Sequence, residues 1–270
     1  MSRYKRKSRC IHMKRLSIKD IQKRIKDGNF TDEEFAQWRE DERKGVMKLM
    51  DSFDREVEKK EQLKRNYEQM CLYEKTYERQ GYSLIAGIDE AGRGPLAGPV
   101  VAASVILPTN TPLYGLTDSK QLNEQERNYF YHKIKEVAIS YHIQMISNEE
   151  VDHINIYEAT KKAMTGAVKS MDIQPDYLLV DAVPLPLEIP TTTLTKGDQK
   201  SISIAAASVL AKVYRDSYMK SIAEEYPQYH FDSHKGYGTK THIEAIQTYG
   251  VTPYHRKTFT PVKRAITNRR

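Results

Sequence analysis

The sequence predicts an α/β fold, a mixed sheet flanked by helices and preceded by a charged helical extension. Three observations lead to this prediction. From residue 84 onward, short apolar runs typical of buried strands alternate with capped, amphipathic segments typical of helices. The chain of 270 residues is long enough for one sizeable α/β domain and an appendage. Before residue 80 the chain is rich in charged residues, and its apolar positions recur at helical spacing.

The first 80 residues are expected to form a helical N-terminal extension. Isoleucines between Ile18 and Ile25 share one helical face, and Gly28 can end that helix. Thr31 and Glu34 form a capping box that starts a second helix. Residues 46–77 are predicted to form one charged helix or a pair of helices.

Residues 81–270 are expected to form the α/β domain with a helical C-terminal segment. Because their apolar runs are short and bounded by turn residues, we expect strands at 84–88, 100–107, 139–146, 177–180 and 191–195. Longer capped segments predict helices at 124–137, 156–171, 201–224 and 241–249. The helix from Ser201 carries a face of alanines, which allows close approach to the sheet.

Composition narrows the functional class. The formal net charge of +7 favours a polyanionic partner such as nucleic acid. Only Cys10 and Cys71 are present, without the spacing of a zinc site or disulfide framework, so we expect a reducing compartment. No apolar run reaches the length of a membrane span, and the basic start lacks a signal-peptide pattern, so we expect a cytoplasmic protein that begins at Met1 or Met13.

The most informative motif follows the first predicted strand. That strand leads into two adjacent carboxylates, Asp89 and Glu90, and then into a glycine loop, Gly92-Arg93-Gly94. Adjacent acids at a strand end indicate a cation site. Glycines allow a ligand to approach the backbone closely, and the guanidinium of Arg93 suits phosphate or hydroxyl oxygens. The motif therefore predicts a bound metal beside an anionic substrate.

Residues 92–97 also match the glycine fingerprint of dinucleotide-binding folds. In those folds the glycines open a helix, whereas here Pro99 is followed by the predicted strand at 100–107. Asp89 and Glu90 would also repel a pyrophosphate. The dinucleotide interpretation is therefore kept as a minor alternative.

The predicted strand 177–180 likewise ends in an acid, Asp181. If the two strands are adjacent and parallel, Asp181 converges with Asp89 and Glu90, and carboxylate oxygens are preferred ligands of Mg²⁺ and Mn²⁺. Two such ions can assist a phosphoryl displacement, which calls for three or four acids. From the residues alone the fourth acid stays open, because Asp198 can simply cap a helix. Its rivals are Asp118, Glu188 and Asp216.

Several motifs together resemble the ribonuclease HII family. They are IDEAGRGPLAGP (88–99), DSK (118–120), LVD (179–181), KGD (196–198), SIAAASVLAKVYRD (203–216), HKGY (234–237) and FTPVKRA (259–265). The resemblance covers residues 84–265 in the order of the family. It implies a ribonuclease H-like catalytic domain over 81–270.

The resemblance further implies a metal-dependent endonuclease. Such an enzyme cuts the RNA strand of RNA–DNA hybrids and nicks duplex DNA 5′ of embedded ribonucleotides, leaving 3′-hydroxyl and 5′-phosphate ends. The family's four carboxylates bind two Mg²⁺ or Mn²⁺ ions, and they correspond here to Asp89, Glu90, Asp181 and Asp198. The resemblance thus selects Asp198 over its rivals.

Substrate-binding residues follow in the same way. Gly92, Arg93 and Gly94 correspond to the loop that reads the ribonucleotide 2′-hydroxyl, and Tyr237 corresponds to the tyrosine that packs on the sugar at the RNA–DNA junction. Lys120 is expected to contact phosphate, as are five further basic residues: Lys196, Lys212, Lys235, Arg256 and Lys257. We expect a monomer. A nucleic-acid-binding module without catalysis is the second hypothesis.

Overall fold

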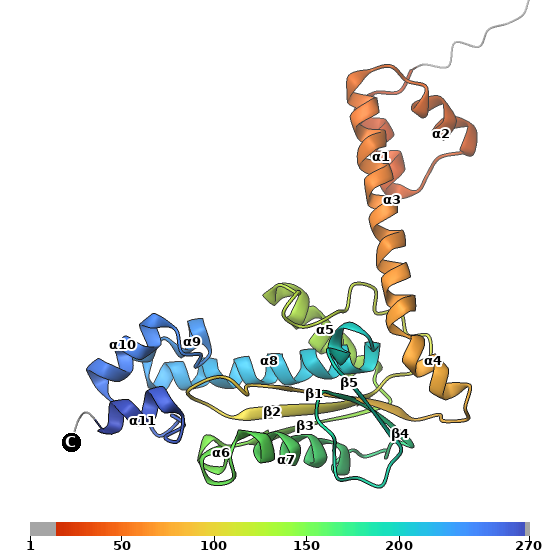
Figure 1. Cartoon of the computed structure of the whole chain (residues 1–270). Coiled ribbons are helices and arrows are strands. Elements are labelled where there is room, and N and C mark those ends of the chain that lie inside the picture. Colours follow the sequence, from red (N-terminus) through yellow and green to blue (C-terminus); the bar gives the residue numbers. More distant parts are fainter. Residues whose placement is uncertain (1–14, 268–270) are drawn as a thin grey trace, which may run out of the picture. The chain divides into compact units, whose positions relative to one another are not determined.

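The computed structural model describes residues 15–267, so Cys10 and Met13 lie outside the described residues (Figure 1). The chain divides into two compact units between Gln62 and Leu63, inside helix α3 (Lys44–Met70). The predicted domain boundary near residue 80 remains a prediction. No helix within residues 15–267 is both long and apolar enough to cross a membrane.

The N-terminal unit is a small helical body. It contains α1 (Ile18–Asp27), α2 (Asp32–Arg39) and the first part of α3. Gly28 ends α1 in a left-handed conformation (φ +63°), and the capping box of Thr31 and Glu34 starts α2, both as the sequence predicts. The side chains of Ile21, Trp38, Val46 and Met50 form its core.

The second unit is built on a five-stranded mixed sheet with the strand order β3-β2-β1-β4-β5. Its strands are β1 (Ile85–Ala91), β2 (Val100–Ile106), β3 (Ser140–Ile146), β4 (Tyr177–Asp181) and β5 (Thr191–Leu194). Strands β1, β2 and β3 pair antiparallel, whereas β4 runs parallel to both β1 and β5. The mixed sheet predicted from the sequence is confirmed.

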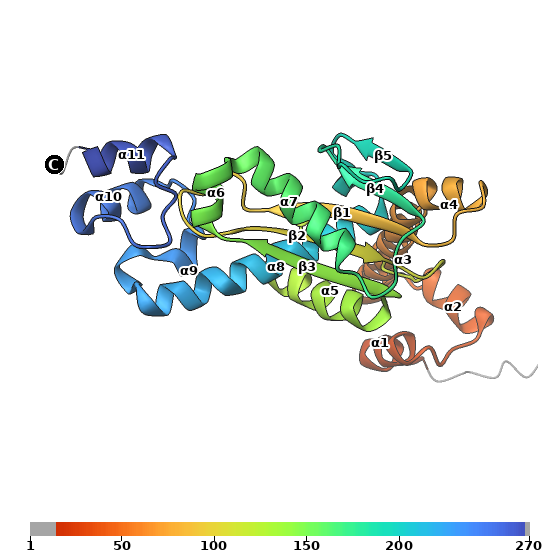
Figure 2. The same cartoon turned by 90° about the horizontal axis from the view of Figure 1, so that it is seen from below.

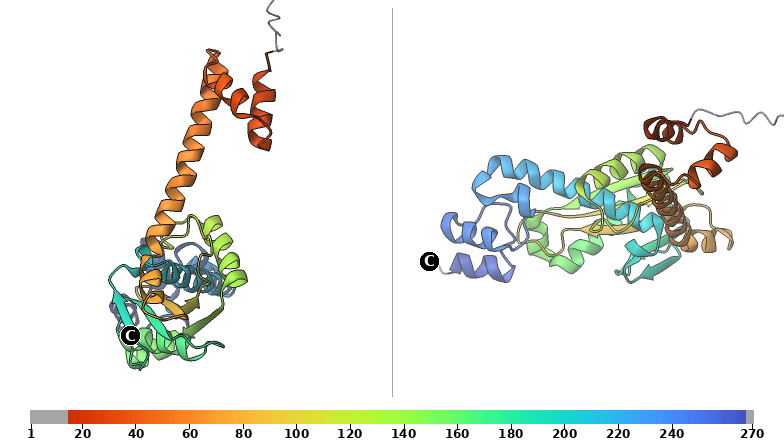
Figure 3. Two further views of the ribbon diagram at one scale, coloured as in Figure 1. Left: turned by 90° about the vertical axis from the view of Figure 1, so that its right-hand side faces the viewer. Right: turned by 90° about the horizontal axis from the view of Figure 1, so that it is seen from above.

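Helices cover both faces of this sheet. Figure 2 shows α7 on one face, and the right-hand panel of Figure 3 shows α8 on the opposite face. The helices of the unit are α4 (Leu72–Glu78), α5 (Glu124–Val137), α6 (Asn148–Ile154), α7 (Ile156–Lys169), α8 (Ile202–Glu225), α9 (Phe231–His234), α10 (Lys240–Tyr249) and α11 (Thr260–Thr267), with 3₁₀ turns η1 (Gly197–Gln199) and η2 (Pro227–Tyr229). Because both faces are covered, every residue of β2 is buried, which explains its continuous run of valine, alanine and isoleucine.

Two elements differ from the sequence predictions. The first predicted strand continues to Ala91, because the antiparallel pairing with β2 extends as far as Ala91 opposite Val101. Asp89 and Glu90 therefore lie within the strand. A helix, α6, precedes α7 and was not predicted, and Asn155 (φ +69°) separates the two helices and caps α7 with its side chain.

The glycine loop after β1 leads directly into β2. A dinucleotide-binding loop would instead open a helix that receives the pyrophosphate. The observed strand therefore excludes the dinucleotide interpretation.

Cys71 is buried as a free thiol.

Helix α8 packs unusually closely on β1. A Cβ atom at Gly87 would lie 2.0 Å from the carbonyl carbon of Ser203 and 2.3 Å from the backbone nitrogen of Ile204. The alanines that face the sheet, Ala205, Ala206, Ala207 and Ala211, are fully buried, as the predicted small-residue face requires. The first turns of α8 thus rest on the backbone of the strand that carries Asp89.

We expect Gly87→Ala to destabilise the chain by about 2 kcal/mol or more, because the added methyl group overlaps backbone atoms that cannot move separately. Urea unfolding measures this loss. Gly94→Ala is the matched control, since its methyl group would meet only Tyr237, at 3.8 Å. Equal stability of the two variants would contradict the close packing described.

Candidate active site

Asp89 and Asp181 lie at the same level on neighbouring strands. Strands β1 and β4 are parallel, and Ile88 stands opposite Val180, so the next residue of each strand is an aspartate. The condition under which the sequence predicted convergence is therefore met. Glu90 follows Asp89 and donates its backbone N–H to Asp89 Oδ1 over 2.7 Å.

Asp198 is brought to the same edge by the tight turn η1. The backbone N–H of Gly197 donates to Asp181 Oδ1 over 2.6 Å, which ties the turn to the end of β4. A Cβ at Gly197 would lie 2.6 Å from Ile204 Cδ1 and 3.2 Å from Asp181 Oδ1, so the turn needs glycine there. Asp198 itself is buried, with 5% of its surface exposed.

The carboxylates strongly perturb one another. Burial raises the pKa of Asp89 well above its usual range, and the charges of Glu90 and Asp181 raise it further. Burial also raises the pKa of Glu90, which Arg93 partly offsets. The pKa of Asp198 rises to about 6 through burial and through repulsion by neighbouring acids, Asp181 among them. The four acids therefore share one electrostatic environment.

This donor set suits a hard divalent cation, because all of its groups are carboxylate oxygens. Glu90 Oε2 is buried and has no hydrogen-bond partner, whereas Oε1 lies 3.3 Å from Arg93 Nη1. A cation would satisfy this unpartnered oxygen and offset the mutual repulsion. Across residues 15–267, no three acidic, histidine or cysteine side chains already stand at the spacing of a metal cluster, so a cation would have to draw the carboxylates together.

The three acids considered as alternatives to Asp198 lie in different environments. Asp118 is buried and raises the pKa of Asp198, so it lies beside the four carboxylates as a fifth acid. Its Oδ2 accepts from Gln199 Nε2 over 3.3 Å. Glu188 is exposed, and Asp216 pairs with Lys212 over 2.9 Å.

Lys120 lies at this same edge of the site. Its Nζ is 3.7 Å from Asp198 Oδ2 and 3.9 Å from Asp118 Oδ1, and 79% of its side chain is exposed. Burial of the ammonium opposes the charged form, but the attraction of the two carboxylates outweighs it and raises the pKa of Lys120. An exposed cation beside the acids is positioned to meet a phosphate.

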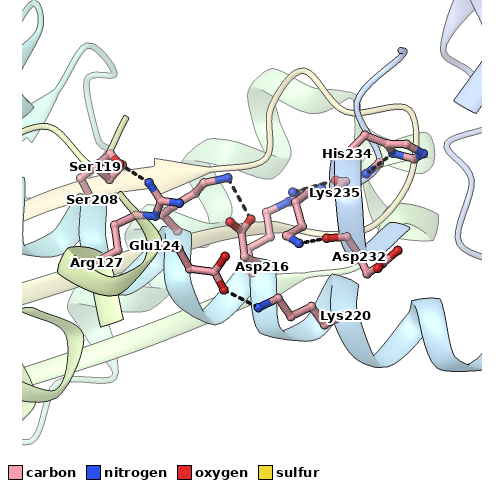
Figure 4. Close-up of polar contacts among 12 residues, drawn as sticks. Ser119, Glu124, Arg127, Ser208, Asp216, Lys220, Asp232, His234 and Lys235 are labelled. Atoms are coloured by element: carbon pink, nitrogen blue, oxygen red, sulfur yellow. Dashed lines mark hydrogen bonds and ion pairs between the residues drawn. The ribbon is translucent and has the colours of Figure 1, made fainter. Parts of the chain in front are cut away.

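A chain of hydroxyls connects the Asp118–Lys120 segment to Asp89. Ser119 Oγ lies 3.0 Å from Ser208 Oγ, and the Ser208 hydroxyl hydrogen-bonds to the carboxylate of Asp89. Figure 4 shows Ser119 and Ser208 close together at the left of the labelled residues. Nothing in the sequence singled out Ser208 beyond its place in the motif at 203–216 that resembles the family.

Two buried arginines hold the glycine loop from behind. Arg256 donates to the carbonyl oxygens of Gly92, Arg93 and Gly98 over 2.6, 2.9 and 3.0 Å. Arg215 donates to the carbonyl oxygens of Ala97 and Pro99, which follow the loop, and to that of Lys235, over 3.1, 3.0 and 3.1 Å. The predicted phosphate contact of Arg256 is therefore wrong, since its side chain is fully buried and its donors already have partners. Burial lowers the pKa of Arg256 to about 9, which still leaves it cationic at neutral pH.

The same loop meets Tyr237. The ring of Tyr237 lies against Gly94, where an added Cβ would be 3.8 Å from Cε1. Tyr237 is 44% exposed, so one face is free to contact a ligand. Lys212 Nζ lies 6.0 Å from its ring centroid. The structure thus brings Arg93, Gly94 and Tyr237 together at the surface, whereas Gly92 is buried behind them.

A polar groove of about 290 Å³ lies beside α5, α8 and α9 (Figure 4). Its cations already have partners: Lys220 pairs with Glu124 over 2.6 Å, and Arg127 donates to the carbonyl of Ser119 over 3.1 Å. Lys235, from the predicted phosphate-binding set, donates to the carbonyl of Asp232. A phosphate contact here would require these cations to exchange partners.

A chain of buried histidines supports the backbone of Tyr237. The N–H of Thr252 donates to His255 Nδ1 over 2.9 Å, the Nε2 atoms of His255 and His242 lie 3.1 Å apart, and His242 Nδ1 lies 2.9 Å from the Tyr237 carbonyl oxygen. A backbone N–H only donates and a carbonyl only accepts, so one arrangement of protons fits: both rings are neutral and each donates toward Tyr237. Protonation of either ring would place two donors face to face.

Burial keeps these rings neutral. It lowers the pKa of His242 to about 4, and with the repulsion of His242 it lowers the pKa of His255 to about 3. An unfolded histidine titrates near 6.5, so the unfolded chain binds more protons between these values, and folding weakens as the pH falls through this window.

We expect each of these two histidines to remove on the order of 2 kcal/mol of folding free energy between pH 7 and pH 5. Urea unfolding across this range compares the wild type with His255→Gln, whose pH slope should be flatter. The exposed His132→Gln is the matched control. The buried carboxyls, whose raised pKa values act in the opposite direction, cancel in this difference. Parallel slopes in all three proteins would contradict the neutral histidine chain.

Comparisons with known proteins identify the family. The family model described as Ribonuclease HII matches residues 86–262, and the one described as Ribonuclease HII N-terminal domain matches residues 17–78. The ribonuclease HII of Halalkalibacterium halodurans is 48% identical over 258 residues, covering 95% of this chain and 98% of the relative. That of Oceanobacillus iheyensis is 50% identical over 251 residues, covering 93% and 96%.

Solved structures share the fold. The ribonuclease H2 of Pyrococcus horikoshii aligns with a TM-score of 0.60 and 26% identity, covering 69% of this chain and 98% of that protein. A structure of Bst-RNase HIII in complex with Mn²⁺ aligns with a TM-score of 0.54 and 17% identity, over 69% of this chain and 71% of that protein. The family models and the long, closely similar relatives together show that this chain belongs to the ribonuclease HII family of endoribonucleases.

Proposed function

We propose that four carboxylates form the metal-dependent catalytic centre of this endoribonuclease: Asp89, Glu90, Asp181 and Asp198. As a member of the ribonuclease HII family, the chain hydrolyses the RNA strand of RNA–DNA hybrids and nicks duplex DNA at embedded ribonucleotides. The observation that carries the proposed centre is the shared environment of the acids, in which burial and mutual repulsion raise the pKa of Asp89, Glu90 and Asp198. Such repulsion opposes folding unless a ligand offsets it.

The proposed cofactor is a pair of Mg²⁺ or Mn²⁺ ions. The oxygen-only donor set and the unpartnered Glu90 Oε2 support a hard divalent cation, and a ribonuclease HIII of the same fold binds Mn²⁺. When bound, the ions would lower the pKa of the attacking water and stabilise charge on the phosphate and the leaving oxygen. The chain's own part would be to hold the four carboxylates close together at one edge of the sheet.

Substrate recognition is assigned to the surface around the glycine loop. Backbone groups at Gly92 and Gly94 would hydrogen-bond the 2′-hydroxyl, the local feature that separates a ribonucleotide from its DNA neighbours. The two buried arginines hold this loop rigid by its carbonyl oxygens. Arg93, which is exposed, and Lys120, which stands beside Asp198, would contact phosphate or sugar oxygens.

Tyr237 would direct the cut to the RNA–DNA junction. Its exposed ring beside Gly94 can stack on the sugar that follows the ribonucleotide, where a second 2′-hydroxyl would clash. Cleavage would then fall 5′ of the ribonucleotide and leave a 3′-hydroxyl and a 5′-phosphate. The proposed partners are RNA–DNA hybrids and DNA duplexes with embedded ribonucleotides, bound by a cytoplasmic monomer.

A nucleic-acid-binding module without catalysis remains the second candidate on sequence grounds. The buried acids argue against it, because carboxylates beside a phosphate path repel the ligand unless a cation lies between them. Persistent duplex binding without cleavage in Mg²⁺ or Mn²⁺ would favour this second candidate.

We expect Asp89→Asn to lower cleavage by about 10³-fold, because several kcal/mol of charge stabilisation depend on each metal ligand. The assay uses an end-labelled DNA duplex with one ribonucleotide, in Mg²⁺, in Mn²⁺ and in chelator, with an all-DNA duplex as control. In chelator the same variant should melt roughly 2–4 °C higher, since it removes a buried charge that repels its neighbours. Full cleavage by Asp89→Asn would overturn the proposed centre.

We expect Gly94→Ala to lower kcat/KM on the single-ribonucleotide duplex by about tenfold or more while its melting temperature stays unchanged. The methyl group fits beside Tyr237 in the free protein but occupies the space into which the sugar must come. Steady-state kinetics and thermal melting measure the two effects. Wild-type kcat/KM would remove Gly94 from the proposed 2′-hydroxyl reader.

A further inference from the structure

Glu74, in α4, is an acid that lies outside the proposed catalytic centre. One of its carboxylate oxygens, Oε1, accepts hydrogen bonds from Ser201 Oγ (2.5 Å), Ser203 Oγ (2.5 Å) and the backbone N–H of Ser203 (3.1 Å). The other oxygen, Oε2, is buried and has no hydrogen-bond partner. Three donors on one oxygen and none on the other make this an uneven site for a carboxylate.

The two serines belong to the junction between the η1 turn and α8. Ser201 is the N-cap of α8, where its hydroxyl accepts from the N–H of Ile204 over 3.2 Å. Its backbone N–H closes the preceding turn by donating to the carbonyl of Gly197 over 2.9 Å. Asp198 lies between these two anchor points. A shift of Ser201 would therefore move the backbone of Asp198 directly.

The helix that carries Glu74 also contacts the segment that carries Asp181. Tyr77 stacks on Tyr177 with ring centroids 3.9 Å apart, and its hydroxyl lies 2.5 Å from Thr192 Oγ1. Tyr177 begins β4, and Asp181 ends it. Helix α4 thus contacts two of the three segments that present acids to the centre, β4 and the junction after η1.

A purely stabilising helix cap does not account for this arrangement. A serine or asparagine would cap α8 without burying a second, unpartnered oxygen, which costs free energy of desolvation. A charge at this point does favour the positive end of α8, a helix of 24 residues. Burial raises the pKa of Glu74, so the position of the turn depends on the three hydrogen bonds that the carboxyl accepts at the junction.

We infer that Glu74 is a positioning residue for the reaction: it fixes the start of α8 and thereby sets the place of Asp198 relative to Asp181. The inference rests on the proposed role of Asp198. It gives α4, which the N-terminal family model includes, a part in the chemistry. Loss of Glu74 should then weaken metal binding and turnover more than it weakens substrate binding.

The experiment compares Glu74→Ala, Glu74→Gln and Glu78→Ala in the full chain. Glu78 is the matched control, since it lies in the same helix and its side chain accepts a hydrogen bond from the exposed Thr109 hydroxyl over 2.7 Å. Isothermal titration with Mn²⁺ alone measures metal affinity without turnover, and steady-state cleavage of the single-ribonucleotide duplex gives kcat and KM. We expect Glu74→Ala to weaken Mn²⁺ affinity and lower kcat, each about tenfold, with KM nearly unchanged.

Glu74→Gln should restore most of both quantities, because its amide oxygen can accept the same three hydrogen bonds, and Glu78→Ala should behave as wild type. If Glu74→Ala fails to fold, Ser203→Ala decides, since it removes one donor and should show a smaller loss of the same kind. The inference would be overturned if Glu74→Ala, or Ser203→Ala in its place, matched Glu78→Ala in kcat and Mn²⁺ affinity. It would also be overturned if the variant raised KM alone.

Asp198→Asn, measured in parallel, separates this inference from the proposed function. Wild-type kcat and Mn²⁺ affinity in Asp198→Asn would refute the role of Asp198, and with it the basis of the inference. An inactive Asp198→Asn together with a normal Glu74→Ala would refute the role of Glu74 alone.

Discussion

The contact between Gly87 in β1 and the first turns of α8 sets the geometry of the rest of the catalytic unit. Because Gly87 places no side chain between the strand and the helix, α8 lies very close to β1. Ser208, about one and a half turns further along α8, therefore reaches the carboxylate of Asp89 in β1. The η1 turn, just before α8, then falls against the end of β4, where Gly197 bonds Asp181. Further along the same helix, Arg215 holds the backbone around the glycine loop. The close packing of α8 on β1 therefore positions both the acids and the glycine loop.

The site combines groups that oppose folding with groups that support it. Repulsion among buried carboxylates raises the pKa of Asp89, Glu90 and Asp198, and this repulsion is a cost that the fold carries for function. Neighbouring structure offsets the cost by satisfying polar groups: Arg256 donates three hydrogen bonds to backbone carbonyls, and Arg215 does the same. Each of these buried arginines donates three hydrogen bonds to carbonyl oxygens, which rigidify the loop without a surface charge as partner.

The sequence predicted the mixed sheet, most helix boundaries and the condition for Asp89 and Asp181 to meet. These features depend on local hydrophobic periodicity and on the acids at strand ends, both of which can be recognised in the sequence. It did not predict contacts made by residues distant along the chain. Arg256 was predicted to contact phosphate because it lies in an aromatic, basic segment. The local sequence is the same whether such an arginine faces solvent or is buried against backbone carbonyl groups. Glu74 lies in a charged helix where nothing local separates it from Glu78, and only its contact with Ser203 does so. Likewise, the path of two histidine rings from Thr252 to Tyr237 joins residues of two separate segments.

The two halves of the site share a preference for neutral or alkaline conditions, although they reach it by different routes. Asp198, with a pKa of about 6, must lose its proton before it can ligate a cation, so proton and metal compete as the pH falls toward 6. The histidine chain beneath Tyr237 must stay neutral, since a proton on His242 or His255 breaks the line of donors that supports the Tyr237 carbonyl. A fall in pH therefore protonates the carboxylates directly, and it disturbs Tyr237 through the histidine chain that supports its carbonyl group. A metal would therefore compete with protons directly at the acids, whereas the histidine chain would respond to it only through the folding free energy.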